Sequence, residues 1–442
     1  MPGPPLPEFP HDDTLPSRVD VVVIGGGVIG SCTALELTER GLKVALCEKG
    51  RIAGEQSSRN WGWVRLSKRD PREVPLMVES IRLWDGLARR TNADVGYVRC
   101  GTAFFCDTDE ILDSYTHWVD NIDGYQIDAG MVGPDEIAER FPDLEKKYKG
   151  ALVSSFDGKA EPQKAGPAIA AAARAKGAKI LTDCAVRTIE NEGGKVSGVV
   201  TERGAIACDA VVVAGGAWTR KLLWNEGHDL PQLTVTNSVM RTAPLDGPSG
   251  SFADGTYAVR KRDDGGYTIS SLAANAFDLT IDTLRLMRQF LPALAMQWRN
   301  LRPEFKPTVS RATRPGRSWT SKDVSPFEHA RVLDPKPSEA DLTRIMRKLT
   351  AAYPEFGKAK IVQKWAGTID VTPDAVPVMS EVDGRPGLFV ATGFSGHGFG
   401  ISPGAGKLMA DIVTGADPLV DPTPFRWTRF HDGTRPKPMA GV

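Results

Sequence analysis

The chain has 442 residues, more than one hydrophobic core usually holds, so its length predicts two domains. Lysine plus arginine and aspartate plus glutamate number 55 each. This balance excludes a protein that binds nucleic acid or an anionic membrane through its net charge. Six scattered cysteines without metal-ligand spacing indicate reduced thiols, so we expect a cytoplasmic protein without a metal site.

The two ends of the chain lie outside the two predicted domains. Residues 1–16 are proline-rich and acidic and lack the basic and apolar regions of a secretory signal, and we expect them to be flexible. Residues 421–442 form a C-terminal tail. The longest apolar runs are too short to span a bilayer, which predicts no transmembrane segment.

A strand, a glycine-rich turn, a helix and a second strand follow one another near the start. Residues 19–24 form a β-branched run typical of a buried parallel strand, and residues 25–30 read GGGVIG. A helical pattern then closes at Gly41, and residues 43–47 predict a second strand that ends at Glu48. This order is that of a βαβ unit carrying G-x-G-x-x-G, which predicts an ADP-containing dinucleotide.

Each part of this motif has a physical role in such a site. Gly25 permits the tight turn, Gly27 lets the backbone approach a pyrophosphate, and Gly30 allows close packing of helix on strand. Glu48 stands where a carboxylate accepts both ribose hydroxyls and repels a 2'-phosphate. The alternative is a glycine-rich turn without a ligand, and the unit alone does not distinguish NAD from FAD.

Sequence patterns typical of the nucleotide-binding domain occur again in two later parts of the chain. We assign residues 17–90, 156–230 and 362–420 to one discontinuous domain, and residues 91–155 and 231–361 to a second domain interleaved with it. Hydrophobic periodicity predicts helices over 74–90, 167–176 and 281–291, and strands over 101–105, 179–181, 196–200 and 210–214.

A second glycine-rich stretch, GFSGHGFGISPGAG, occupies residues 393–406. It begins like the G-x-S-x-G turn of serine hydrolases, but His397 replaces the last glycine of that pattern, so the pattern fails. Six glycines in fourteen residues cost folding entropy, which favours a functional reason for them. The helix that we expect after Pro403 would direct its N-terminal dipole toward this stretch.

Four motifs together resemble the FAD-dependent amine and amino-acid oxidoreductases, the family of D-amino acid oxidase, glycine oxidase, D-amino acid dehydrogenase and monomeric sarcosine oxidase. They are the βαβ segment at 21–50, SSRNWGW at 57–63, DAVVVAGGAW at 209–218, and the C-terminal pair that begins with WAGTIDVTPDAVPV and ends with the glycine-rich stretch. The resemblance implies an α/β fold in which a Rossmann-like FAD-binding domain is interleaved with an α+β substrate domain on a large mixed or antiparallel sheet. It extends over most of the chain.

The resemblance also implies which residues bind FAD. It places the glycine-rich stretch beside the flavin, the segment after residue 56 along the pyrophosphate, Val186 at the adenine and the end of the strand near 213 against the dinucleotide. The full set of expected FAD-binding residues is Gly25, Gly27, Val28, Ile29, Gly30, Glu48, Lys49, Ser57, Ser58, Arg59, Asn60, Val186, Gly215, Gly216, Trp218, Gly393, Gly396, His397, Gly398, Phe399 and Gly400.

The chain departs from its family at the positions that bind flavin covalently or hold substrate. It has no cysteine in 365–370 and no histidine near Asn60, which implies non-covalent FAD. The arginine that holds a substrate carboxylate in glycine oxidase is missing from 367–370, and Gly400 replaces the lysine of sarcosine oxidase. Other cations must then bind a carboxylate. The candidates are Arg65, Lys68, Arg314 and Arg317, with Arg260 and Lys261 as further possibilities.

Other side chains have open roles. Asp370 is a candidate for recognising a second amine. Four aromatic residues, Trp61, Trp63, Tyr257 and Tyr267, line a pocket or belong to the core, and the core is the safer interpretation.

The resemblance implies oxidation of the C–N bond of an amino acid or secondary amine, such as a D-amino acid, an opine or an N-alkyl amino acid. Hydride passes to flavin N5, and the imine hydrolyses. We assign no catalytic base. Molecular oxygen or a quinone accepts the electrons. The alternatives are a quinone- or partner-linked dehydrogenase, a non-catalytic flavoprotein subunit and an NAD-dependent dehydrogenase.

Overall fold

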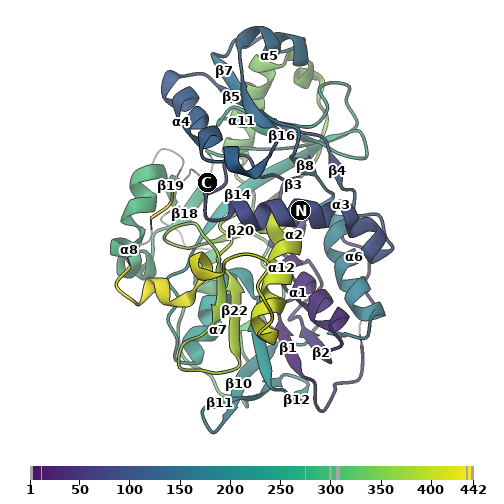
Figure 1. Ribbon diagram of the computed structural model, residues 1–442, viewed down its shortest axis with the longest axis vertical. Coiled ribbons are helices and arrows are strands. Elements are labelled where there is room, and N and C mark those ends of the chain that lie inside the picture. The colour runs from purple at the N-terminus through teal and green to yellow at the C-terminus, as the bar shows by residue number, and fades with distance from the viewer. Residues whose placement is uncertain are drawn as a thin grey trace.

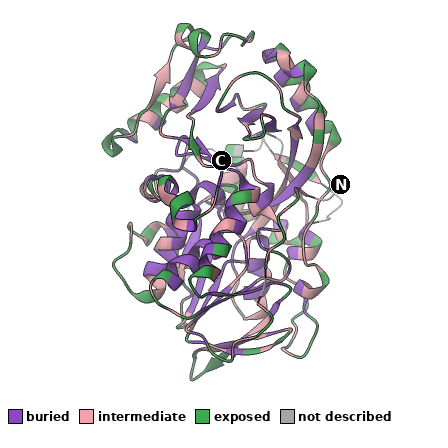
Figure 2. Ribbon diagram, turned by 90° about the vertical axis from the view of Figure 1, so that its right-hand side faces the viewer, coloured by how far each residue is buried: buried purple, intermediate pink, exposed green. Residues whose placement is uncertain are grey.

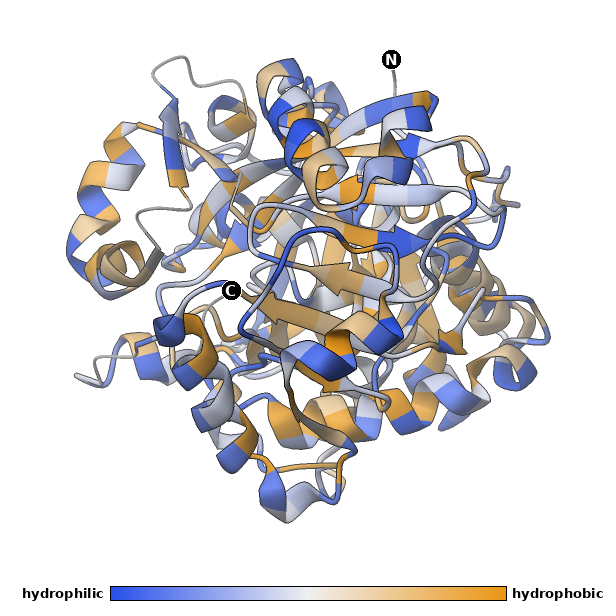
Figure 3. Cartoon of the chain, turned by 90° about the horizontal axis from the view of Figure 1, so that it is seen from above, coloured by the Kyte–Doolittle hydropathy of each residue, from blue (hydrophilic) through white to orange (hydrophobic). Residues whose placement is uncertain are grey.

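The computed structural model describes residues 3–10, 12–273, 275–297, 301–304, 309–434 and 437–439. Two sheet-based regions lie one above the other in Figure 1, and strand β14 and helix α2 lie where they meet. Figure 2 shows buried strands inside and exposed segments on the outward faces of helices. Figure 3 shows the same division in hydropathy: the inner strands are mainly hydrophobic, and the outer helices carry both hydrophobic and hydrophilic residues.

A six-stranded sheet forms the lower region, in the order β21-β22-β13-β1-β2-β9. Neighbouring strands are parallel except β21 and β22, which are antiparallel. Its central strands are almost wholly apolar and buried, as expected for a sheet covered on both faces. The strands are β1 Val21–Ile24, β2 Val44–Cys47, β9 Lys179–Leu181, β13 Ala210–Val213, β21 Val378–Glu381 and β22 Leu388–Thr392.

Helices α1 (Val28–Glu39), α6 (Pro162–Ala175) and α12 (Gly398–Thr414) pack beside this sheet, with α1 between the other two. A small three-stranded sheet, β10 (Val186–Glu192), β11 (Lys195–Thr201) and β12 (Gly204–Ala207), lies next to it. The predicted helix over 167–176 in fact begins at Pro162, because proline is well suited to a first helical turn.

A ten-stranded mixed sheet forms the upper region. Its path is β19-β18-β14-β17-β16-β15-β5-β7-β6, and β20 pairs with β14. The strands are β5 Thr102–Cys106, β6 Ala129–Val132, β7 Gly150–Ser154, β14 Leu233–Thr242, β15 Ser251–Ala253, β16 Ala258–Lys261, β17 Tyr267–Ser270, β18 Asn275–Asp278, β19 Leu301–Glu304 and β20 Ile361–Val371. The α/β class and the large mixed sheet are therefore confirmed.

The upper region has an aromatic core of its own. Tyr257 and Tyr267 are fully buried in it, together with Phe252 and Tyr353, so the core interpretation is confirmed for these two tyrosines. The remaining elements connect or cover the sheets. They are α2 Gln56–Arg59, β3 Trp63–Val64, α3 Val74–Thr91, β4 Val98–Arg99, α4 Asp109–Asp120, α5 Pro134–Arg140, β8 Gly158–Lys159, α7 Thr219–Asn225, α8 Ile281–Gln297, α9 Val309–Thr313, α10 Pro326–His329 and α11 Glu339–Ala352.

Strand β20 lies on the other side of the expected domain boundary. The sequence boundary assigns residues 362–420 to the nucleotide domain, whereas β20 pairs with β14 of the large sheet along nearly its whole length. The C-terminal end of β20 nevertheless reaches a cavity at the carboxyl end of β13, through Thr368, Ile369 and Asp370. Because its end lines this cavity, β20 carries one of the family's cofactor-associated motifs although the strand itself belongs to the large sheet.

The described part of residues 1–16 makes packing and polar contacts, contrary to the flexibility that we expected there. Leu6 and Phe9 pack against the hydrophobic core. The Asp12 carboxylate accepts a hydrogen bond from the backbone N–H of Ile180 at 2.9 Å and pairs with Arg174 at 3.2 Å. These contacts attach the first residues to β9 and α6. Among the described residues, no helix is both long and apolar enough to cross a membrane.

Candidate active site

A cavity of about 170 Å³ opens beyond the carboxyl ends of β1, β2 and β13. This edge is the ligand-binding position of doubly wound parallel sheets. Of the predicted dinucleotide-binding residues, the structure brings these to its wall: Gly25, Gly27, Val28, Ile29, Glu48, Lys49, Ser57, Asn60, Val186, Gly215, Gly216, Trp218, Gly396, Gly398 and Phe399.

The glycines of this wall are required by close approaches of backbone. Gly25 has φ +113°, and a Cβ there would lie 2.5 Å from the carbonyl oxygen of Ala214. A Cβ on Gly30 would overlap the carbonyl oxygen of Gly25, so α1 packs directly on the turn that precedes it. Gly216 has φ +51° and faces open space, which keeps the cavity free of a side chain.

The polar groups of the cavity fit a dinucleotide. Glu48 accepts hydrogen bonds from the backbone N–H groups of Gly26 and Gly50, each at 2.7 Å. Burial raises the pKa of this carboxyl. Each of its oxygens retains a lone pair for a ribose hydroxyl. The buried hydroxyls of Thr219 and Thr368 also line the cavity and have no hydrogen-bond partner in the described part of the chain.

Ser57 lies at the N-terminus of α1, where its hydroxyl accepts the backbone N–H of Val28 at 2.8 Å. A helix N-terminus with a serine beside it is a suitable position for a pyrophosphate. The residues that follow do not share this role. The Ser58 hydroxyl donates to the carbonyl of Glu55, and Arg59 pairs with Asp334 at 2.7 Å; neither residue lines the cavity.

Lys49 reaches the cavity wall, but its ammonium group is used within the protein. It donates to the Glu55 carboxylate and to the carbonyl oxygens of Ala330 and Arg331 at 2.7–2.9 Å, and it lies over the Trp218 ring. The three N–H donors of the ammonium are thereby satisfied. Its contribution to ligand binding is consequently limited to backbone and stem.

The glycine-rich stretch at 393–400 separates the first cavity from a second one. Gly396 and Phe399 line both, Gly398 lines the first, and His397 and Gly400 line the second. Gly393 lines neither. Its N–H donates at 2.7 Å to Asp370, whose carboxylate also accepts from Gln232 and Thr392. Burial raises the pKa of Asp370. With these bonds, Asp370 holds the glycine-rich stretch in place.

Helix α12 begins at Gly398, six residues before the start that we expected at Gly404, after Pro403. Proline inside a helix normally leaves the carbonyl four residues earlier without a donor. Here the Ser402 hydroxyl donates to that carbonyl, of Phe399, at 2.8 Å, which removes part of the cost. The earlier start brings the N-terminus of α12 to the boundary between the two cavities.

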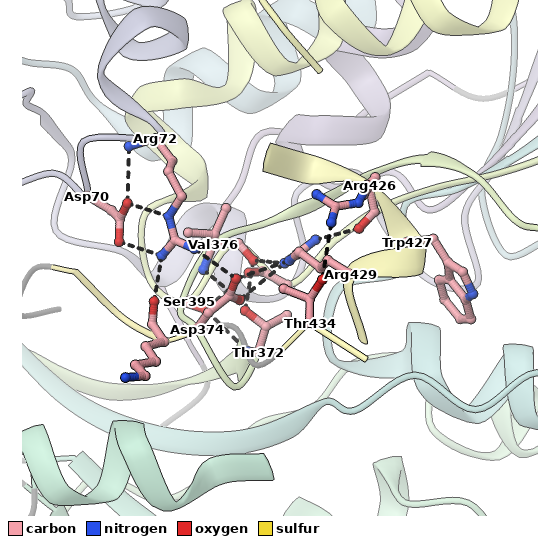
Figure 4. Close-up of polar contacts among 12 residues, drawn as sticks. Asp70, Arg72, Thr372, Asp374, Val376, Ser395, Arg426, Trp427, Arg429 and Thr434 are labelled. Atoms are coloured by element: carbon pink, nitrogen blue, oxygen red, sulfur yellow. Dashed lines mark hydrogen bonds and ion pairs between the residues drawn. The ribbon is translucent and has the colours of Figure 1, made fainter. Parts of the chain in front are cut away.

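A buried ionic network fixes the turn that faces this boundary (Figure 4). Asp374 pairs with Arg429 at 3.1 Å and with Arg72 at 3.3 Å, and Arg72 also pairs with Asp70 at 2.8 Å. Within the same turn, the backbone N–H of Thr372 donates to the Ser395 hydroxyl at 3.3 Å. The bond between Thr372 and Ser395 therefore ties the segment after β20 to the glycine-rich stretch.

The second cavity has a volume of about 480 Å³ and a mostly apolar lining. It shares six wall residues with the first cavity: Gln56, Asn60, Ala217, Ile369, Gly396 and Phe399. Since the two share these residues, a ring bound at the boundary faces both. Trp61, Trp63 and Arg65 form the inner end, beside the glycine-rich stretch, while α8 and α9 form the outer end.

Two of the four expected carboxylate anchors line the second cavity. Arg65 is 8% exposed, and one of its nitrogens donates to the Ser67 carbonyl. Burial lowers the pKa of Arg65 to about 10, so it remains a cation at neutral pH. No carboxylate among the described residues pairs with it within 4.0 Å. Arg314, on the segment after α9, also lines the cavity but is exposed to solvent.

The other expected cations lie outside both cavities. Lys68 lies over the rings of Phe104 and Tyr115, and burial lowers its pKa to about 7. Arg317 is exposed at the surface. Arg260 forms a bidentate pair with Glu161 at 2.7 and 3.0 Å. Lys261 donates to the Leu245 carbonyl and, at 3.2 Å, to the Tyr267 hydroxyl.

Sequence reasoning missed two arginines of the second cavity, Arg69 and Arg220. Arg69 pairs with Glu73 at 3.3 Å and donates to the His397 carbonyl at 3.0 Å, so it supports the glycine-rich stretch from below. Neither residue carries a motif that distinguishes it from a surface cation. His397 itself lies 3.5 Å from Glu73, and burial lowers its pKa to about 4, which keeps it neutral.

The parallel sheet and the cavity at its carboxyl edge are typical of a dinucleotide-binding protein. Comparison with known proteins identifies the kind: the family model described as FAD-dependent oxidoreductase matches residues 20–412. The chain belongs to this family. It is an FAD-dependent oxidoreductase, which excludes the NAD-dependent alternative.

Individual relatives match along most of this chain at modest identity. An L-amino acid deaminase from Proteus myxofaciens, solved in complex with anthranilate, superposes with a TM-score of 0.92 and 32% identity over 97% of each chain. A glycine oxidase from Geobacillus kaustophilus is 27% identical over 430 residues, covering 93% of this chain and 97% of that protein. A formaldehyde-forming 4-methylaminobutanoate oxidase from Paenarthrobacter nicotinovorans is 26% identical over 427 residues, or 95% of this chain. The chain spans 46%, about half, of that relative's length.

Proposed function

We propose that the chain oxidises the C–N bond of an α-amino acid, or of its N-substituted derivative, with non-covalently bound FAD in the first cavity and substrate in the second. The observation that carries the proposal is the 480 Å³ cavity itself. It joins the dinucleotide cavity at Gly396 and Phe399 and contains a buried arginine, Arg65, without an ion-pair partner in the described residues.

Arg65 is the proposed anchor for the α-carboxylate. A guanidinium group binds a carboxylate through two parallel hydrogen bonds, and burial strengthens such a contact. With the carboxylate held at the inner end, the Cα–H bond lies close to the boundary between the cavities. Bound FAD supplies the hydride acceptor, and the imine product is hydrolysed by water to a keto acid or aldehyde and an amine.

The size of the second cavity favours a substrate larger than glycine. A volume of about 480 Å³ falls in the range of cavities that enclose drug-sized ligands, and its mainly apolar lining suits a long or aromatic side chain. The L-amino acid deaminase from Proteus myxofaciens, with anthranilate in its structure, supports an amino acid as substrate class. L-amino acids are therefore the first compounds to test, followed by D-amino acids, opines and N-alkyl amino acids.

The electron acceptor is a separate part of the proposal, with molecular oxygen and a quinone as the two choices. We also propose a cytoplasmic location on the basis of six cysteines that are all free thiols, five of them buried. Cell fractionation with an antibody to the protein tests that location.

The deciding experiment mixes the holoenzyme anaerobically with pools of L-amino acids, D-amino acids, N-methyl amino acids and opines, and records the flavin absorbance. We expect one pool to bleach the flavin, and readmitted air or an added quinone then identifies the acceptor by the rate at which colour returns. Flavin that dithionite reduces but that no pool reduces would contradict the proposal.

A further inference from the structure

The outer end of the second cavity contains a group of polar side chains separate from Arg65. Arg220 of α7, Ser310 of α9 and Arg314 all line it. The charged neighbours of Arg65 are Arg69, Glu73 and Asp157, whereas Arg220 is paired with Asp229 and Asp282. The two arginines share no ion-pair partner, so they form separate polar groups in a cavity whose lining is mainly apolar.

The buried polar groups that lack a hydrogen-bond partner at the outer end are groups that can donate a hydrogen bond. Arg220 is 3% exposed, and its Nη2 has no hydrogen-bond partner within the described ranges. The buried Ser310 hydroxyl has none there either. A buried donor without an acceptor costs free energy, which a ligand acceptor at that point removes.

The acidic groups nearby are already engaged. Asp282 lies 3.6 Å from Arg220, and Asp278 accepts the backbone N–H of Ser310 at 2.9 Å. Arg314, by contrast, has no carboxylate within 4.0 Å among the described residues. Its positive charge also acts on Lys221, whose ammonium donates at 2.5 Å to the carbonyl of Ala312. The unpaired groups at this end therefore favour an anionic acceptor over a cation.

We propose that the outer end binds a second carboxylate, so that the preferred substrates are amino acids whose side chain or N-substituent ends in a carboxylate. Arg220 Nη2, the Ser310 hydroxyl and Arg314 hold this group while Arg65 holds the α-carboxylate. The inference rests on the proposed function, of which it names the substrate class.

Matched substrates test it in the anaerobic holoenzyme assay. Glutamate differs from norvaline, and 2-aminoadipate from norleucine, only in having a carboxylate in place of the terminal methyl group. We expect the diacid of one pair, in one enantiomer, to reduce the flavin at concentrations at least about tenfold lower than its partner, because charge-assisted hydrogen bonds carry such factors. Equal or better reduction by both monoacids overturns the proposal.

Two variants and one control separate binding from folding. Arg314→Gln and Ser310→Ala are each expected to lower the preference for the diacid over the monoacid at least about fivefold. Arg317→Gln, three residues further along and outside the cavity, is the control and keeps the preference. A preference that survives Arg314→Gln also overturns the proposal.

A binding measurement distinguishes failure of this inference from failure of the proposed function. Glutarate and pentanoate are titrated into the oxidised holoenzyme while the flavin spectrum is recorded. Tighter binding of glutarate that is lost in Arg314→Gln supports the second carboxylate site even if no amino acid reduces the flavin. Equal binding of the two acids contradicts the site even if amino acids do reduce it.

Discussion

The two joined cavities are built in different ways. The dinucleotide cavity has glycines in short segments of its wall such as 25–29 and 213–219, which lie at the carboxyl ends of parallel strands. The substrate cavity consists of side chains from α2, β3, α7, α8, α9, β14 and β20, which are far apart in the sequence. The comparison shows that cofactor binding depends on where side chains are absent, whereas substrate binding depends on which side chains are present.

The largest effect is expected from adding a side chain to the first cavity's turn. In Gly30→Ala the new Cβ overlaps the carbonyl oxygen of Gly25, so α1 must move away from the pyrophosphate position. We expect a nearly colourless protein, with at least about tenfold less flavin per chain. Gly86→Ala in α3, where a Cβ has room, is the control. A fully yellow Gly30→Ala protein would show that backbone approach does not govern cofactor binding.

Removing a charge from the second cavity is expected to have the next largest effect. Arg65→Gln should raise the substrate dissociation constant about ten- to a hundredfold, because it removes charge-assisted hydrogen bonds to a carboxylate. The flavin content should stay unchanged. Stopped-flow reduction at a series of substrate concentrations measures the constant, and Arg65→Lys should restore part of the affinity. Unchanged affinity in Arg65→Gln would remove Arg65 from the site.

His397, on the wall between the cavities, gives a pH dependence of stability. Burial holds its pKa at about 4 instead of 6.5, so between these values the unfolded chain binds a proton that the native chain does not. Stability is therefore lost as pH falls from about 6.5 toward 4, by about 1–2 kcal/mol at about pH 5. His397→Asn should remove this part of the slope in urea unfolding of the flavin-free protein. The exposed His117→Asn should retain it.

The smallest effect is expected from one hydroxyl at the N-terminus of α1. Ser57→Ala removes the acceptor of the Val28 N–H, a loss typical of a helix cap and worth about 1 kcal/mol, or about fivefold in FAD affinity. Ser58→Ala is the matched control, because the hydroxyl of Ser58 lies outside the cavity. Fluorescence titration of flavin-free protein measures both. Equal losses would show that the two serines act through folding.

The difference between the two cavities also determines which of their residues could be predicted from the sequence. Gly25, Gly27 and Glu48 belong to a motif with fixed spacing, so their place in the cavity could be read from the sequence. The sequence could not show that the charged groups of Lys49 and Arg59 are used within the protein, because their partners Ala330 and Asp334 are hundreds of residues away along the chain.

In the substrate cavity, sequence reasoning found Arg65 by its proximity to a motif and included Lys68 for the same reason. The positive φ of Lys68, 64°, accompanies a side chain that lies against Phe104 and Tyr115 instead of the cavity. Arg220 was missed because a lone cation in a short helix has no sequence signal. Its role depends on α8 and Gln232, which only the tertiary fold brings to it.

The pairing of β14 with β20 has a consequence for how the enzyme works. This single antiparallel ladder, from Leu233–Val371 to Thr242–Ile361, passes both cavities, with Ile369 on the wall of each. The end of β20 is also bonded to the segment after β22 of the lower sheet, because Gly393 N–H donates to the Asp370 carboxylate and Ser395 N–H donates to the Asp370 carbonyl. Rotation of one region against the other would break these bonds at the place where substrate and flavin meet. Their relative distance is preorganised, and substrate specificity can evolve through α8 and α9 without disturbing the geometry of hydride transfer.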